Sequence, residues 1–176
     1  MSWITVNKDR IKMNKNHRRK YKIWWTVVLV IVLALVVFFR GAFGPRQENE
    51  QKAVAVAEKY AHLSHKSNYY EFSRAGKEYH TVEGTNRTGE KIYAIVSANN
   101  RRINVFAANK GLTAKQVSAQ IVQQRKPKRI LHVALGMDQQ GKQPVWEVTY
   151  LNQSGNLCYS LVEFKTGTVT KEIQNL

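Results

Sequence analysis

The chain has 176 residues, of which 28 are Lys or Arg, 12 are Asp or Glu and one is Cys, and its formal net charge is +16. The single cysteine, Cys158, excludes an internal disulfide framework, so the fold must be held together by hydrophobic cores. The strong positive charge favours a neighbourhood of anionic polymers or phosphate-bearing lipids. Residues 1–40 carry half of this charge, and the rest of the chain carries the other half.

Residues 23–39 read IWWTVVLVIVLALVVFF and contain no charged residue, proline or glycine. Such a run predicts a membrane-spanning helix, because backbone polar groups in hydrocarbon must be satisfied within the segment. A cleaved signal peptide is the alternative, but this run exceeds the roughly 7–15 apolar residues that are typical of one. We expect an uncleaved anchor with boundary residues Ile23, Trp24, Trp25, Phe38 and Phe39.

The segment before this helix, residues 1–22, holds eight basic residues and one acidic residue. The positive-inside bias therefore predicts that residues 1–22 lie in the cytoplasm and that the chain beyond the helix is exported. We predict a single-pass protein of the cell membrane with extracytoplasmic C-terminal domains. Export also argues against nucleic acid, which is the usual partner of such a basic chain.

The exported part begins with residues 40–51, which carry Gly, Pro and charges and predict a linker. Apolar residues then recur at steps of three and four over residues 53–64, which predicts a helix. Three strand-like segments with Gly- and Asn-bearing turns follow at residues 78–83, 91–98 and 101–107. We assign residues 52–110 to a first unit. Its aromatic residues Tyr69, Tyr70 and Phe72 are expected in the core or at the rim of an interface.

A second unit, residues 111–176, begins with a complete helix start. Thr113 is the expected N-cap and Gln116 its capping-box partner, and Val117, Ile121 and Val122 supply an apolar face. Strand-like segments follow at residues 130–137, 144–151, 157–164 and 168–173. In the second of these, we expect Trp146 to face the helix and Glu147 and Thr149 to face water. Cys158 is expected to be a small core residue.

The two units have a similar order of elements. The turn residues Gly89 and Gly141 are 52 positions apart, and the aromatic strand residues Tyr93 and Trp146 are 53 apart. This spacing predicts a degenerate internal repeat. The expected fold class is α+β, with an N-terminal transmembrane helix and two tandem units. Each unit has one helix packed on an antiparallel sheet of three to four strands, and the two units pack against each other or share a sheet.

The exported part offers no pattern of catalytic or metal-binding residues. Its one aspartate, Asp138, lies in a predicted hairpin turn, where Asp is common, and no spacing pairs its glutamates for acid/base work. His62 and His65 are three residues apart on the predicted first helix, but no third ligand stands at metal spacing. We therefore expect no enzymatic activity, no cofactor and no metal.

Two other features are candidates for binding. A predicted helix-to-strand loop places four cations in five residues: Arg125, Lys126, Lys128 and Arg129. It could contact an anionic polymer or lipid, although a solvated loop is the simpler interpretation. Edge strands of an open antiparallel sheet are the second candidate, because they can accept a strand from a partner.

The basic start, the anchor helix and the two consecutive helix-plus-sheet units together resemble the TseB-like cell wall elongation regulators of Gram-positive bacteria. The units resemble cystatin-like domains related to PepSY. The local likeness is carried by the tryptophan strand at residues 144–150, the strand at residues 157–164 and the Gly-bearing hairpin at Thr166 and Gly167. The chain departs from the pattern with Asn86 and Gln139 in place of acidic turn residues.

The resemblance implies a non-enzymatic membrane protein whose exported domains contact a penicillin-binding protein or related wall-synthesis protein. Two alternatives stay open. PepSY-related modules also act as inhibitors or chaperone-like partners of secreted proteases, and the basic exported part could instead bind anionic wall polymers.

Overall fold

The computed structural model describes the backbone of residues 3–174 and the side chains of residues 21–39 and 45–174. The chain divides into two compact units, residues 1–47 and residues 48–176. We call the second unit the body. It contains eight strands in two sheets, the last turns of one helix and the whole of another.

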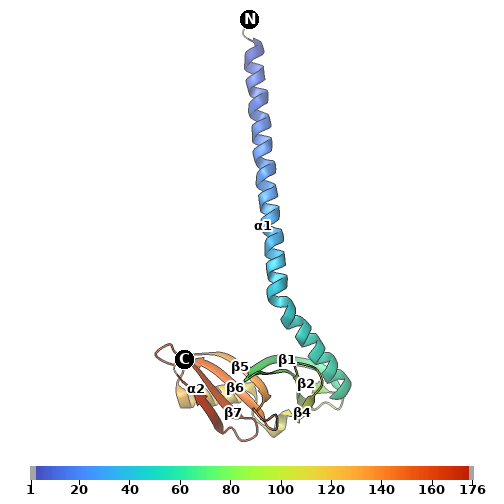
Figure 1. Ribbon diagram of the computed structural model, residues 1–176, viewed down its shortest axis with the longest axis vertical. Helices are drawn as coiled ribbons and strands as arrows, with labels where there is room; N and C mark the ends of the chain where they lie inside the picture. The colour runs from blue at the N-terminus through green and yellow to red at the C-terminus, as the bar shows by residue number, and fades with distance from the viewer. Residues whose placement is uncertain (1–2, 175–176) are drawn as a thin grey trace. The chain divides into compact units, whose positions relative to one another are not determined.

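Helix α1 (Trp3–Tyr60) contains the apolar run (Figure 1). Its segment Tyr21–Phe39 has a mean hydropathy of 2.6, and none of it is buried against the rest of the described chain. A helix of 19 residues rises about 28 Å, close to the ~30 Å hydrocarbon core of a bilayer. The segment therefore fits a single-pass membrane anchor.

Residues 40–51, which we expected to form a linker, are helical and continue α1 with Pro45 inside the helix. Beyond the proline, Glu48 and Lys52 pair one turn apart at 2.6 Å, which supports the helix locally. The expectation rested on the low helix propensity of Gly and Pro, and propensity is readily overridden by neighbouring turns. The two compact units divide at Gln47 and Glu48, shortly after Pro45.

The first sheet of the body has the strand order β1-β2-β3-β4, and all neighbours are antiparallel. Its strands are β1 (Leu63–Arg74), β2 (Lys77–Asn86), β3 (Lys91–Ser97) and β4 (Ile103–Ala107). The predicted helix to residue 64 was too long, because α1 ends at Tyr60 and His62 turns the chain at a φ of 53°. Strand β1, which had not been predicted, follows at once.

One face of this sheet packs against the end of α1. Ala53 and Ala57 of the helix are fully buried against Val82, Ala94 and Val96 of the sheet. Small side chains on the helix allow this close approach, and the helix thereby removes one apolar sheet face from water.

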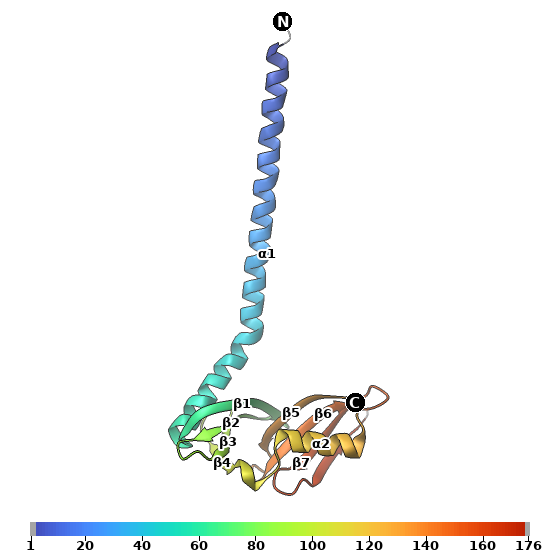
Figure 2. The same ribbon diagram turned by 180° about the vertical axis from the view of Figure 1, so that it is seen from behind.

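The second sheet has the order β5-β6-β7-β8, again antiparallel throughout, and α2 lies across it (Figure 2). The 3-10 helix η1 (Ala108–Lys110) connects the two sheets, and the remaining elements are α2 (Ala114–Arg125), β5 (Arg129–Met137), β6 (Pro144–Leu151), β7 (Leu157–Glu163) and β8 (Val169–Ile173). The predicted capping box is confirmed: the Thr113 hydroxyl accepts from the Gln116 backbone N–H, and the Thr113 N–H donates to Gln116 Oε1 at 2.8 Å. Val117 and Ile121 are buried as predicted, but Val122 is exposed.

The two sheets share a core, as expected of units that pack against each other. Tyr93 and Ile95 of β3 point away from α1 and join Trp146, Val148 and the buried face of α2. Cys158, the predicted small core residue, is buried in the same cluster. The body is therefore one α+β unit with two sheets, each with a helix on one face.

The opposite face of the second sheet is covered by the β1–β2 hairpin of the first sheet, and β1 lies beside β5 (Figure 1). Phe72 sits directly on Gly136, where any larger residue would collide with its ring. Arg74 at the hairpin tip forms an ion pair with Glu147 at 2.6 Å. The expectation that Glu147 and Thr149 face water was therefore wrong, because both are buried.

The two aromatic residues that suggested an internal repeat lie on strands that are not equivalent in the two sheets. Tyr93 lies on β3, the third strand of its sheet, whereas Trp146 lies on β6, the second strand of the other sheet. Tyr93 and Trp146 were matched as equivalent residues because the prediction did not include β1. Both halves nevertheless follow the order of one helix and then four antiparallel strands.

Candidate functional site

The predicted membrane boundary residues all lie on α1. Ile23, Trp24 and Trp25 are near one end of the apolar segment, and Phe38 and Phe39 are at the other. All five side chains are exposed, and each aromatic pair packs edge to face, at 5.4 Å for the tryptophans and 5.9 Å for the phenylalanines. This exposure of large aromatic rings is suited to a lipid interface rather than to water.

The predicted cationic loop joins α2 to β5. Arg125 is the last residue of α2, and its Nε pairs with Glu172 Oε1 at 2.8 Å. Lys126 caps the helix in the left-handed conformation, and the Lys128 N–H donates to the Leu151 carbonyl at 2.8 Å. At least one of the four cations is therefore already paired with a carboxylate. The backbone of the loop ends α2 and begins β5. The four residues are adjacent, but they do not line any of the cavities described for the body.

Strands β4 and β8 are edge strands of the kind that the sequence analysis predicted. Strand β4 pairs only with β3, and β8 pairs only with β7, among the strands that the structure describes. Val105 on β4 is 44% exposed. Edges of this kind leave backbone donors and acceptors that a partner strand can pair with.

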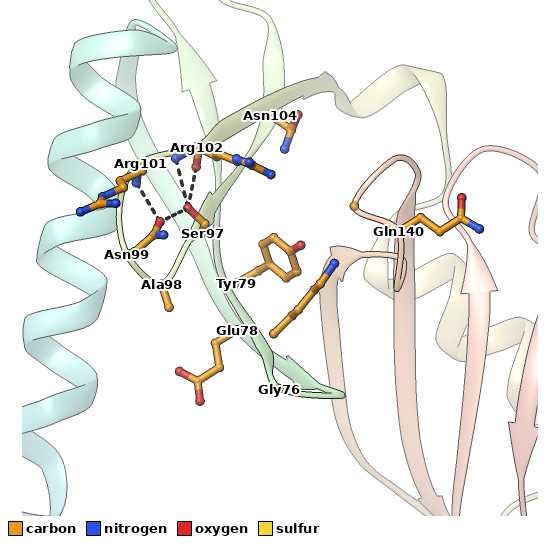
Figure 3. A pocket seen from close by; sticks show the side chains of 12 residues that line it. Gly76, Glu78, Tyr79, Ser97, Ala98, Asn99, Arg101, Arg102, Asn104 and Gln140 are labelled. Atoms are coloured by element: carbon orange, nitrogen blue, oxygen red, sulfur yellow. Dashed lines mark hydrogen bonds between the residues drawn. The ribbon is translucent and has the colours of Figure 1, made fainter.

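A cleft of about 460 Å³ opens where three turns of the body meet (Figure 3). The β1–β2 turn and the start of β2 supply Lys77 and Tyr79. The β3–β4 turn and the start of β4 supply Arg102 and Asn104, and the β5–β6 turn supplies Gly141. The Tyr79 hydroxyl approaches the last of these turns, since a Cβ placed on Gly141 would lie 3.7 Å from it. The cleft thus gathers polar side chains from segments that are far apart in the sequence.

The turns around the cleft are fixed by local hydrogen bonds. Ser97 Oγ donates to Asn99 Oδ1 at 2.7 Å and accepts the Arg102 N–H at 3.1 Å. On the other side, Lys77 Nζ donates to the Gln139 carbonyl at 2.7 Å, which joins the start of β2 to the β5–β6 turn. In Figure 3, Arg102 and Tyr79 point into the same space, whereas Glu78 and Arg101 are directed away from it.

The charged residues that line the cleft are three cations, Lys77, Arg101 and Arg102, and one carboxylate, Glu78. Among the described residues, no carboxylate lies within ion-pair distance of Lys77, Arg101 or Arg102. Asp138, in the β5–β6 turn, accepts the Lys142 N–H through Oδ1 at 2.7 Å. Sequence reasoning missed this site, because the Arg101-Arg102 pair is its only local signal and Lys77 joins it solely through the packing of the two sheets.

The tyrosines with raised pKa values lie away from the cleft lining. Burial raises the pKa of Tyr93 well above its usual value near 10. Burial also raises the pKa of Tyr70, whose hydroxyl donates to Glu83 Oε2 at 2.6 Å. These shifts favour neutral phenols inside the fold and do not activate an exposed group.

The histidines that we considered as metal ligands are separated by the fold. His62 lies in the turn after α1, and His65 lies on β1 rather than on the predicted helix. Within the described residues, no group of three or more His, Cys, Asp or Glu side chains is placed to hold a metal ion.

Comparison with known proteins agrees with this architecture. Residues 52–97, from the end of α1 through β3, match the family described as the cell wall elongation regulator TseB-like domain. A protein of Bacillus subtilis (strain 168) described as probable cell wall elongation regulator TseB is 29% identical over 156 residues, which is 86% of this chain and 92% of the relative. The chain is a relative of the TseB-like cell wall elongation regulators.

The solved structure of the YpmB protein from Bacillus subtilis superposes with a TM-score of 0.62 at 29% identity, over 72% of this chain and 98% of that one. The resemblance drawn from the layout of the sequence is thereby confirmed.

Proposed function

We propose that this chain is a membrane-anchored, non-enzymatic, extracytoplasmic regulator of peptidoglycan elongation that acts by contact with a penicillin-binding protein or a related wall-synthesis protein. The observation that carries the proposal is the likeness to a cell wall elongation regulator over 86% of this chain. The likeness covers 92% of the length of that relative.

The anchor helix supports the proposal because it limits the body to the membrane surface. In the proposed topology, residues 1–22 are cytoplasmic, residues 23–39 span the membrane, residues 40–51 leave it, and the units at residues 52–110 and 111–176 lie outside. Confinement raises the effective concentration of the body toward a membrane-bound partner, so a weak contact suffices.

The outer edge of β4 is the contact surface that we favour. It carries free backbone hydrogen-bonding groups beside the half-exposed Val105, and a partner strand could extend the first sheet there. A regulator of this kind needs no catalytic group.

In-cell photo-crosslinking of the full-length protein tests the proposal. A photoreactive residue at Val105 on β4 is compared with one at Val122 on α2, which has the same side chain and similar exposure, 49% against 44%. We expect capture of a penicillin-binding protein or another wall-synthesis protein, and stronger capture from Val105.

Failure to capture a wall-synthesis protein at either position, together with unchanged incorporation of a peptidoglycan label in a deletion strain, would contradict the proposal. Recovery of a secreted protease alone would instead favour the inhibitor alternative.

A further inference from the structure

We propose that the cleft between the β1–β2, β3–β4 and β5–β6 turns binds a phosphate group carried by a polymer or lipid at the outer membrane face. The inference rests on the extracytoplasmic placement in the proposed function. It names a ligand class for a cleft that the protein–protein contact does not use.

Four of the side chains that line the cleft can donate hydrogen bonds. Lys77 and Arg102 are cationic, the Tyr79 hydroxyl and the Asn104 amide can donate, and all four line the same space. They come from two separate hairpins that are held together by the shared core. Charge-assisted hydrogen bonds from such groups to an oxyanion are shorter and stronger than neutral ones.

Cationic charge exceeds acidic charge in the cleft, because Glu78 is the one carboxylate among its lining residues and is directed away from the space. The part of the chain that the structure describes places no carboxylate within 4.0 Å of the Lys77 ammonium or the Arg102 guanidinium. By contrast, Arg74 and Arg125 are each paired with a glutamate. Two cations that line one cleft without a carboxylate partner favour an anion from outside the protein, and the Lys77 ammonium keeps donors beyond the one that it gives to the Gln139 carbonyl.

The volume of the cleft favours a ligand larger than a single inorganic ion. About 460 Å³ lies within the range of roughly 300–1,000 Å³ that is typical of small-molecule sites. That space exceeds the needs of one inorganic ion and accommodates a phosphate together with the glycerol or sugar that bears it. Basic pockets of membrane proteins bind the phosphate-bearing head groups of lipids, and the phosphate of a polymer presents the same kind of oxyanion.

The cleft is distinct from the predicted cationic loop. Residues 125–129 carry a comparable charge but line no described cavity, and Arg125 is already paired with Glu172. A double substitution in the loop therefore serves as a control, because it removes two positive charges without changing any residue that lines the cleft.

The test is a titration of the full-length protein in neutral detergent with two probes. One is a soluble oligo(glycerol phosphate), and the other is mixed micelles with phosphatidylglycerol, compared with phosphatidylcholine. We expect Lys77→Gln/Arg102→Gln to weaken binding at least about tenfold, because charge-assisted hydrogen bonds from both side chains to the phosphate are lost. The control Lys128→Gln/Arg129→Gln should change it less than about twofold.

The two probes distinguish between the two sources of phosphate. Binding of the oligomer identifies a polymer phosphate, and binding of phosphatidylglycerol micelles alone identifies a lipid headgroup. Absence of binding to both, equal losses in the two double variants, or equally tight binding of poly-glutamate would overturn the proposal. Thermal unfolding of each variant shows that the body is intact. Because the assay contains no wall-synthesis protein, its failure leaves the cross-linking result, and hence the proposed function, separately testable.

Discussion

The rings of Tyr93 and Trp146 meet edge to face, with centroids 5.7 Å apart and planes at 90°. Tyr93 comes from the first sheet and Trp146 from the second, and both are fully buried. Tyr93 also contacts Phe164 edge to face at 5.7 Å. Aromatic contacts of this geometry add about 0.5–1.5 kcal/mol beyond the burial of their area. The two sheets are therefore joined by a core that belongs to neither alone, and the cleft between their turns depends on that core.

Two substitutions at Tyr93 should distinguish the contribution of the ring to stability from that of its hydroxyl. The Tyr93 hydroxyl is buried and has no hydrogen-bond partner among the described residues. We expect Tyr93→Phe to leave the free energy of unfolding unchanged or to raise it by about 1 kcal/mol, because an unsatisfied polar group is removed. Tyr93→Ala should lower it by about 3–5 kcal/mol. Urea unfolding of the full-length protein in neutral detergent measures both, and a large loss in Tyr93→Phe would contradict this assignment.

The contact between Phe72 and Gly136 predicts a second effect. A methyl group at position 136 would overlap the Phe72 ring. We expect Gly136→Ala to destabilise the body by about 1–3 kcal/mol through overpacking. Adding Phe72→Leu should recover part of the loss, so the double-mutant cycle should show coupling. Strict additivity of the two changes would show that the ring does not rest on this glycine.

The sequence predicted those features that depend on neighbours along the chain. The apolar run of α1, the capping box at Thr113 and the hairpin turns that contain Gly89 and Gly141 are each encoded within a few residues. Strand β1 was missed because the helical spacing before it appeared to continue through Ser64. A period of 3.6 cannot indicate where pairing with a distant strand takes over.

Features built from distant segments could not be predicted in this way. Glu147 alternates with Trp146 as a water-facing residue should, yet the β1–β2 hairpin of the other sheet covers it. The cleft has the same origin, because Lys77, Arg102 and Gly141 come together only when the two sheets pack. Local patterns define elements, whereas this site is defined by contacts between elements.

The ion pair between Arg74 and Glu147 should contribute to stability because it is largely shielded from water. The two side chains are 21% and 10% exposed. Loss of one partner leaves the other charge poorly solvated, and we expect Arg74→Gln to cost about 1–3 kcal/mol. The matched control is Lys52→Gln, which breaks the well-exposed pair with Glu48 and should have no measurable effect. Equal effects of the two substitutions on urea unfolding would show that the burial of the Arg74 pair has no energetic consequence.

The raised pKa values of Tyr70 and Tyr93 predict a loss of stability at alkaline pH. Burial favours the neutral phenol in both, and for Tyr70 the hydrogen bond to Glu83 acts in the same direction. In the unfolded chain, a tyrosine ionises near pH 10. The unfolded state therefore loses protons first as the pH rises, so the stabilisation is complete below about pH 10 and declines above it. The slope per tyrosine should be at most about 1.4 kcal/mol per pH unit, and less for the partly exposed Tyr70.

Unfolding of the wild type and of Tyr70→Phe/Tyr93→Phe between pH 8 and pH 11 tests this prediction. The double variant cannot ionise at either position, so its stability should decline less steeply above pH 10. Tyr60, which is 59% exposed, supplies the control, and Tyr60→Phe should leave the wild-type slope unchanged. Parallel curves for the wild type and the double variant would mean that other groups cause the alkaline loss and that these two phenols ionise as readily in the fold as outside it.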